Sequence, residues 1–238
     1  MESEDGAFKS TLWSVVLRSR AGSESDHRAA LERLGRTYWP PLFVYLLRKG
    51  YSREDAQDAI QGFFAHFLEK ELLDRIDPDR GRFRTFLLFV LERFLANERR
   101  IARAEKRGGG APILSLDFSR AETRVSVPAA PGETPEKAYH RAWGLSVLRQ
   151  AFETLKVEFE KSKPPGWYEA VCARLQADSD TSTYEEEARR LGCAPADFKN
   201  LLYLTRRRLR GLIRESIRDT VDRDEDIDRE FMELFNSR

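Results

Sequence analysis

A run of positively charged side chains follows Phe198, in a chain of 238 residues whose net charge is only +1. Between residues 198 and 214 there are six Lys or Arg residues and no Asp or Glu. Arginine can grip phosphate groups or the edge of guanine, while asparagine pairs with adenine and tyrosine reaches phosphate. The residue types suit a DNA groove. The alternatives are a solvated helix face or a basic face docked on an acidic protein.

A helix over this segment separates the donors from the apolar side chains. At about 100° per residue, the face of Phe198 also carries Leu201, Leu202, Thr205, Leu209, Leu212 and Ile213. The opposite arc carries Lys199, Asn200, Tyr203, Arg206, Arg207, Arg210 and Arg214. A solvated face usually places Glu four residues from Arg, and none is present here. The pattern therefore favours nucleic acid as the ligand of this face.

The residues before this helix predict a helix-turn-helix. Thr183 and Glu186 form a capping-box pattern, so a helix is expected to begin between them. Gly192 is expected to turn the chain, and Pro195 to begin the helix that carries the donors. Two helices joined by a short turn containing glycine have the proportions of a DNA-binding helix-turn-helix.

A second basic block lies in the N-terminal half, next to an acidic one. Bases outnumber acids nine to three over residues 80–107, and acids outnumber bases eight to three over residues 52–79. The acidic block opens a helix with a capping pattern at Ser52 and Asp55, SREDAQDAIQGFFAHFLEKEL. The basic block contains the helical segment FRTFLLFVLERFLANERRIARAEKR. The apolar positions of the two helices predict a core made of Ala56, Ile60, Phe63, Phe64, Phe67, Leu68, Phe86, Phe89, Val90, Phe94 and Leu95.

Further helices are expected on both sides of these blocks. HRAALERLGRTYW and PLFVYLLRKG are predicted as separate helices, because Pro40 and Pro41 precede the second, which Gly50 ends. A long helix begins near residue 135 and carries Leu145, Leu148, Phe152, Leu155 and Phe159 on its apolar side.

The composition predicts an all-α protein of two helical domains. Leu, Ala, Arg and Glu recur, and these residues favour helices over strands. Three consecutive glycines and a stretch rich in Pro, Ser and Thr predict a flexible linker over residues 108–134. The domains are expected at residues 11–107 and 135–217, followed by an acidic C-terminal extension, 218–238. This extension is expected to cap the second domain, and the alternative is a shield over the basic helix.

The sequence lacks the patterns that indicate a disulfide framework, a metal site, an active site or a membrane span. Cys172 and Cys193 form no CxxC pair and the three histidines are scattered, so neither a disulfide framework nor a zinc site is expected. Without a GxxxxGK loop, an HExxH motif or a nucleophile elbow, no enzymatic activity and no cofactor are expected. The N-terminus is acidic and no apolar run reaches the roughly 18 residues that span a bilayer, so a cytoplasmic protein without membrane insertion is expected.

Together, the segments resemble the extracytoplasmic-function type of bacterial sigma factor, the two-domain initiation subunit of RNA polymerase. SREDAQDAIQGFFAHFLEK is similar to region 2.2 of that family, and RGRFRTFLLFVLERFLANERRIAR to regions 2.3 and 2.4. TYEEEARRLGCAPADFKNLLYLTRRRLRGLIRESI is similar to region 4.2. The order and spacing of these segments, with a linker between them, carry the resemblance across most of the chain. The chain departs from the family pattern at Gly62, Arg93, Ala194 and Leu204.

The resemblance implies a transcription initiation factor that binds core RNA polymerase and directs it to promoter DNA. Contact with the polymerase, at the clamp helices of its largest subunit and at its flap, would use Asp55, Asp58 and Gln61 on the clamp side. Opening and recognition of the −10 element would use Arg84, Arg93, Asn97, Arg100 and Arg103. Recognition of the −35 element would use Lys199, Asn200, Tyr203, Arg206, Arg207 and Arg210.

Phe86, Phe89 and Phe94 are expected in the core rather than as platforms for an unstacked base. The resemblance also implies control by an anti-sigma inhibitor protein. The alternative function is a stand-alone helix-turn-helix regulator, which needs only the C-terminal half and usually acts as a dimer.

Overall fold

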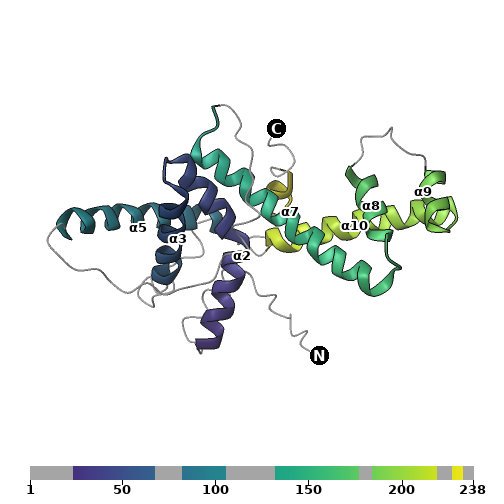
Figure 1. Ribbon diagram of the computed structural model, residues 1–238, viewed down its shortest axis with the longest axis horizontal. Helices are drawn as coiled ribbons and strands as arrows, with labels where there is room; N and C mark the ends of the chain where they lie inside the picture. The colour runs from purple at the N-terminus through teal and green to yellow at the C-terminus, as the bar shows by residue number, and fades with distance from the viewer. Residues whose placement is uncertain (1–23, 68–81, 106–131, 177–183, 219–226, 233–238) are drawn as a thin grey trace, which may run out of the picture. The chain divides into compact units, whose positions relative to one another are not determined.

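All regular structure in the described part of the chain is helical. The computed structural model describes residues 24–67, 82–105, 132–176, 184–218 and 227–232 (Figure 1). Its helices are α2 (Glu24–Arg48), α3 (Arg53–Phe67), α5 (Phe83–Glu105), α7 (Pro135–Ser162), α8 (Trp167–Gln176), α9 (Tyr184–Leu191) and α10 (Pro195–Arg218). Residues 227–232 form a further short helix. The prediction of an all-α protein is confirmed for these residues. The predicted linker lies outside them, apart from residues 132–134.

Contacts within the chain divide it into two units. Unit 1 comprises Met1–Ser146 with Ile217–Arg238, and unit 2 comprises Val147–Ser216. The boundary differs from the one predicted at residue 135 because the first turns of α7 pack against α2. There, Val44 clusters with Ala138 and Ala142 in a buried group.

The core of unit 1 is largely aromatic. The ring of Phe63 lies 5.6 Å from that of Phe67 and 5.9 Å from that of Phe94, centroid to centroid. Phe83, at the start of α5, contacts Tyr38 of α2 at 5.3 Å and Phe67 of α3 at 6.4 Å. The predicted apolar stripe of α3 is confirmed for its described members, which are Ala56, Ile60, Phe63, Phe64 and Phe67. Predicted core residue 68 lies outside the described residues.

Helix α2 continues through Pro40 and Pro41, so the prediction of two separate helices was wrong. A proline inside a helix cannot donate to the carbonyl four residues earlier, which costs about 3 kcal/mol. Both prolines are buried here, beside Trp39 and Phe43, whose rings stack at 4.8 Å. Burial of these side chains offsets the lost hydrogen bonds. The helix ends at Arg48, and Gly50 turns the chain just after it, as predicted, with a φ of 88° that few other residues adopt.

Two local features position α3. Its first turn is capped as predicted, since Ser52 Oγ accepts a hydrogen bond from the Asp55 N–H at 3.0 Å. Farther along, Gly62 faces α5, where an added Cβ would meet Cζ of Phe94 at 3.4 Å. This is an ordinary van der Waals distance, so the structure leaves room for a Cβ at this position.

Unit 2 contains the second part of α7 with α8, α9 and most of α10. Tyr168 of α8 joins α7, because its hydroxyl donates to the carbonyl of Phe152 at 3.2 Å and its ring contacts Phe159 at 5.9 Å. Leu155, Phe159 and Phe198 are buried. Leu145, predicted on the apolar side of α7, is instead exposed. The first turns of α7 bury Tyr139, Ala142 and Trp143, so the buried face shifts along the helix.

The turn between α9 and α10 closes as predicted. Gly192 has a φ of 69°, its N–H donates to the carbonyl of Arg189 at 3.2 Å, and the N–H of Cys193 donates to that of Ala188 at 2.9 Å. This pair of bonds is the Schellman ending of a helix, which requires a left-handed residue. α10 then begins at Pro195, the predicted residue. The capping residue expected at 183 lies outside the described residues.

Candidate nucleic-acid interface

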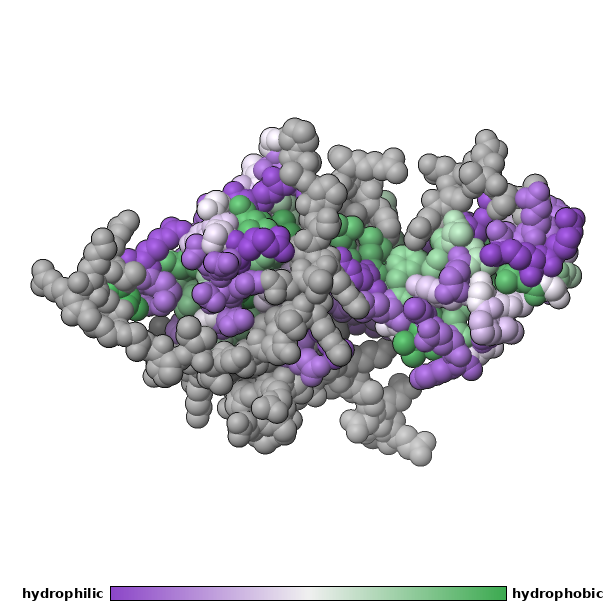
Figure 2. Space-filling view, viewed as in Figure 1, coloured by the Kyte–Doolittle hydropathy of each residue, from purple (hydrophilic) through white to green (hydrophobic). Residues whose placement is uncertain are grey.

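α10 separates apolar from cationic side chains as the sequence predicts. Phe198, Leu202, Thr205, Leu212 and Ile213 are buried, and Leu201 and Leu209 are half-buried. The exposed set comprises Lys199, Asn200, Tyr203, Arg206, Arg207, Arg210 and Arg214. We call these seven residues the donor face. Figure 2 shows hydrophilic residues gathered at the end of unit 2 that carries α9.

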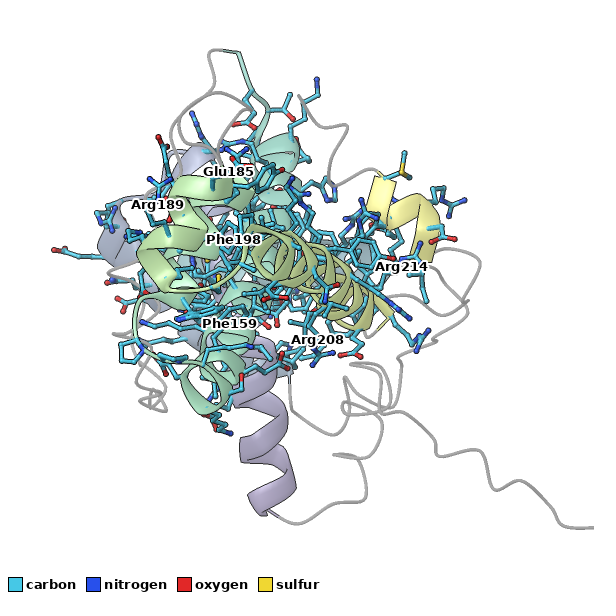
Figure 3. All side chains as sticks on the ribbon, turned by 90° about the vertical axis from the view of Figure 1, so that its right-hand side faces the viewer. Phe159, Glu185, Arg189, Phe198, Arg208 and Arg214 are labelled. Carbon is cyan, nitrogen blue, oxygen red and sulfur yellow. The ribbon has the colours of Figure 1, made fainter. Side chains whose placement is uncertain are left out.

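Arg208 lies in the same run of arginines but belongs to a different face. Its guanidinium group grips Glu158 of α7, with Nη2 2.6 Å from Oε1 and Nε 3.1 Å from Oε2. These hydrogen bonds lower the pKa of Glu158 and raise that of Arg208. Arg208 and Arg214 are labelled on different sides of α10 in Figure 3. Arg208 therefore joins α10 to α7 and is not part of the donor face.

Lys199 is held by an aromatic ring that sequence analysis did not identify. Its Nζ lies 5.1 Å from the ring centroid of Tyr184, the first residue of α9. The guanidinium carbon of Arg174, from α8, lies 4.5 Å from the same centroid. Two cations from different helices thus share one π system, which attracts both. The sequence signal that could have indicated this contact is the aromatic residue at the beginning of the helix that precedes α10.

A second exposed stripe runs along α5. Phe89, Arg93, Asn97 and Arg100 follow one another at spacings of four, four and three residues, which places them on one face. The guanidinium carbon of Arg93 lies 5.7 Å from the centroid of Phe89, and Arg100 Nη2 donates to Asn97 Oδ1 at 3.0 Å. Three of the residues predicted to contact the −10 element are therefore brought together with an aromatic ring. We call these four residues the α5 stripe.

The prediction that Phe89 belongs to the core was wrong, because its side chain is 58% exposed. The buried face of α5 passes through Phe83, Leu87 and Leu91, and Phe89 lies away from it by helical geometry. Phe86 and Phe94 are half-buried and do contact core rings, at 6.4 Å to Phe83 and 5.9 Å to Phe63.

Arg84 does not lie with the α5 stripe. Its side chain is 5% exposed, its Nη2 is 2.7 Å from Glu230 Oε2, and its guanidinium carbon is 4.3 Å from the Trp143 ring centroid. Arg84 is thus buried against Glu230 and Trp143, and its contact with DNA stays a prediction. Arg103 lies within α5, but its side chain is outside the described residues.

The contact with Glu230 also corrects the expectation for the C-terminal extension. The described part of this extension, residues 227–232, packs with unit 1 through Glu230 and the buried Ile227. The extension was expected to cap the second domain. Complementary charge explains the difference, since two arginines at the beginning of α5 attract the carboxylate.

The acidic face of α3 is available as predicted. Asp55 and Asp58 are exposed and Gln61 is half-buried. The carboxylate of Asp55 accepts a hydrogen bond from the hydroxyl of Ser52 at 2.7 Å, which orients it at the first turn of the helix. The three residues share one side of α3, and the neighbouring Glu54 adds a further exposed carboxylate.

The described ranges offer neither a metal centre nor a membrane span. These ranges contain no group of three or more His, Cys, Asp or Glu side chains placed to hold a metal ion. None of the described helices combines the length and the hydropathy needed to cross a bilayer. The chain matches no family model, no curated protein and no solved structure. The donor face and the α5 stripe are the exposed surfaces whose chemistry suggests a ligand.

Proposed function

We propose that this protein is a transcription initiation factor of the sigma type, which binds core RNA polymerase and directs it to promoter DNA. The donor face of α10 carries the proposal. It presents seven exposed side chains that can donate hydrogen bonds, on the second helix of a pair joined by a tight glycine turn. In helix-turn-helix proteins this second helix lies in the major groove.

The donor face provides both kinds of contact that promoter recognition needs. On the helical wheel, Asn200 and Arg207 lie opposite the buried Phe198, where an amide can pair with adenine and a guanidinium with guanine. Arg206 and Arg210 lie toward one edge and would contact phosphate, which fixes the helix in the groove. Tyr203, 63% exposed, adds a hydroxyl donor between them.

The α5 stripe provides the chemistry for holding an unpaired strand. An exposed ring such as Phe89 stacks on an unstacked base, and base stacking on aromatic side chains contributes about 1–3 kcal/mol per base. Arg93 and Arg100 supply positive charge for the phosphates on either side. The stripe would act on the −10 element once its strands separate, with Phe89 added to the contacting residues.

Asp55, Asp58 and Gln61 would bind the polymerase. Exposed carboxylates on the first turns of α3 are complementary to a basic helical surface, and the resemblance identifies that surface as the clamp helices. A partner that inhibits the factor by covering these faces, an anti-sigma protein, is part of the same proposal. Its place of action would be the cytoplasm.

Transcription reconstituted from purified components tests the proposal. Core polymerase supplemented with this chain should initiate at defined sites on templates from the native genome, and the chain should co-elute with core. A double variant, Arg206→Ala with Arg207→Ala, should co-elute with core but initiate less, whereas the matched Arg208→Ala variant should initiate normally. Absence of both initiation and co-elution would refute the proposal.

A second candidate function is a stand-alone helix-turn-helix regulator. It is favoured by the location of α8, α9 and most of α10 within a single unit, since such a regulator needs no other domain. This candidate predicts tight duplex binding without polymerase, at half-sites separated by about one helical turn. Gel-shift measurements with and without core polymerase distinguish the two candidates.

A further inference from the structure

The carboxylate of Glu230 is enclosed by two arginines of unit 1. Its side chain is 1% exposed, and Arg84 Nη2 lies 2.7 Å from Oε2 while Arg82 Nε contacts Oε1. Trp143 covers the Arg84 guanidinium from one side, with the guanidinium carbon 4.3 Å from the ring centroid. Tyr139 anchors the same segment, because its hydroxyl donates to the Arg84 carbonyl at 2.9 Å.

The arrangement has the chemistry of an oxyanion site. Two guanidinium groups that converge on one anionic group are the arrangement by which proteins bind phosphate as well as carboxylate. A buried cation without an anion is strongly unfavourable. The first turn of α5 contains no acid of its own. The anion must therefore come from elsewhere, and Glu230 supplies it.

The segment that carries Glu230 is short. Residues 227–232 form a helix of six residues, which is too short to be stable by itself in water. Within it, Ile227 and Glu230 are buried while Asp228, Arg229 and Met232 are exposed. Its position therefore depends on contacts with the rest of unit 1, among them those of Glu230 and Ile227. An anion of higher charge density could replace it.

We propose that Arg82 and Arg84 form a phosphate-binding site for a nucleic-acid strand, and that Glu230 occupies this site as an internal competitor. The inference rests on the proposed function, because it takes the strand to be the one held by the α5 stripe. The C-terminal segment thereby lowers the affinity of unit 1 for nucleic acid until it is displaced.

Charge removal at Glu230 tests the competition. The full chain is titrated into a fluorescein-labelled single-stranded oligodeoxynucleotide of 12 nucleotides, and anisotropy is followed at several salt concentrations. Glu230→Gln should bind about threefold to tenfold more tightly than the wild type. Its plot of log affinity against log salt should steepen by about 0.7 for each new phosphate contact.

Two further variants show where the gain arises. In Glu230→Gln combined with Arg84→Met the gain should disappear, because the arginine that would bind phosphate is absent. Glu136→Gln, at an exposed acid of unit 1, makes the same change in net charge and should leave affinity unchanged. An equal gain in Glu136→Gln, or a gain that survives Arg84→Met, would overturn the proposal.

Loss of folding must be separated from loss of competition. If Glu230→Gln does not fold, Glu230→Asp retains the charge but shortens its reach, and a smaller gain in affinity is expected from it. A folded variant with no gain, together with a lower melting temperature, would assign Glu230 a purely structural role and refute the proposal. Failure of the proposed function has a different signature, in which Arg206→Ala and Arg207→Ala leave duplex binding and initiation unchanged.

Discussion

Arg208 and Glu158 form a bidentate ion pair that joins α10 to α7, with the closest nitrogen and oxygen 2.6 Å apart. The pair engages one arginine of a run of three consecutive ones, all of which are exposed. Under the proposed function, Arg206 and Arg207 bind DNA, so three adjacent residues of identical chemistry would have two roles. This difference supplies matched variants for separating DNA binding from stability.

Removal of the pair should change stability and leave DNA binding intact. Both side chains are substantially exposed, so Arg208→Ala should lower the free energy of unfolding by only about 0.2–1 kcal/mol. Urea unfolding checks the first expectation, and gel shift with duplex DNA checks the second. A large loss of duplex affinity in Arg208→Ala would place Arg208 on the donor face after all.

The same pair predicts a pH dependence. The hydrogen bonds from Arg208 lower the pKa of Glu158 from its ordinary value of 4.5. A carboxyl group with a lowered pKa in the folded state stabilises the protein above its unfolded pKa, and this contribution is lost as pH falls through the folded pKa. Below about pH 4.5, Glu158→Gln should therefore lose less stability than the wild type on acidification. Equal losses in urea unfolding series at pH 6 and pH 3 would contradict the assignment.

Arg206 and Arg207 should be required for binding to duplex DNA. Each Ala substitution that removes a phosphate contact should reduce the slope of log affinity against log salt by about 0.9. Substitution of a base-reading side chain should instead relax preference at one base pair, at a cost of about 1–3 kcal/mol. Salt titrations of both variants beside Arg208→Ala measure these effects. The same variants should still co-elute with core polymerase, and loss of that binding would mean that the donor face contacts protein.

Phe89 and Phe63 should respond in opposite ways to truncation. Phe89→Ala should barely alter the melting temperature, because the ring is exposed, but should weaken single-strand binding by about 1–3 kcal/mol. Phe63→Ala, in the centre of the aromatic core, should destabilise unit 1 by about 3–5 kcal/mol. Thermal unfolding and oligonucleotide anisotropy measure both. Unchanged single-strand affinity in Phe89→Ala would remove the ring from the proposed interface.

Tyr184 should support the position of Lys199 through its ring rather than its hydroxyl. Tyr184→Phe retains the π face and should behave as the wild type, whereas Tyr184→Leu should lose about 0.5–1 kcal/mol of stability in unit 2. Duplex affinity should follow the same order if Lys199 contacts DNA. Equal effects of Phe and Leu in calorimetry would show that the cations gain nothing from the ring.

Helix phase and caps were accessible from sequence because they depend on residues a few positions apart. The donor face follows from a period of 3.6 residues, the Ser52 cap from a residue and its neighbour three positions on, and the Gly192 turn from the freedom of glycine at positive φ. Pro40 and Pro41 show the limit of such rules. Their local preference ends a helix, and the free energy of burying the side chains around them reverses it.

The sequence by itself determined the helical character of the described residues, the blocks of charge along the chain and the one-sided arginines of α10. Only the tertiary structure decided that Phe89 is exposed, that Arg208 pairs with Glu158 and that Arg84 is enclosed by Glu230 and Trp143. These outcomes depend on contacts between segments far apart in the chain. The charge and polarity of a side chain limit the ligands that it can bind. The segment that packs against the side chain decides whether solvent or nucleic acid can reach it.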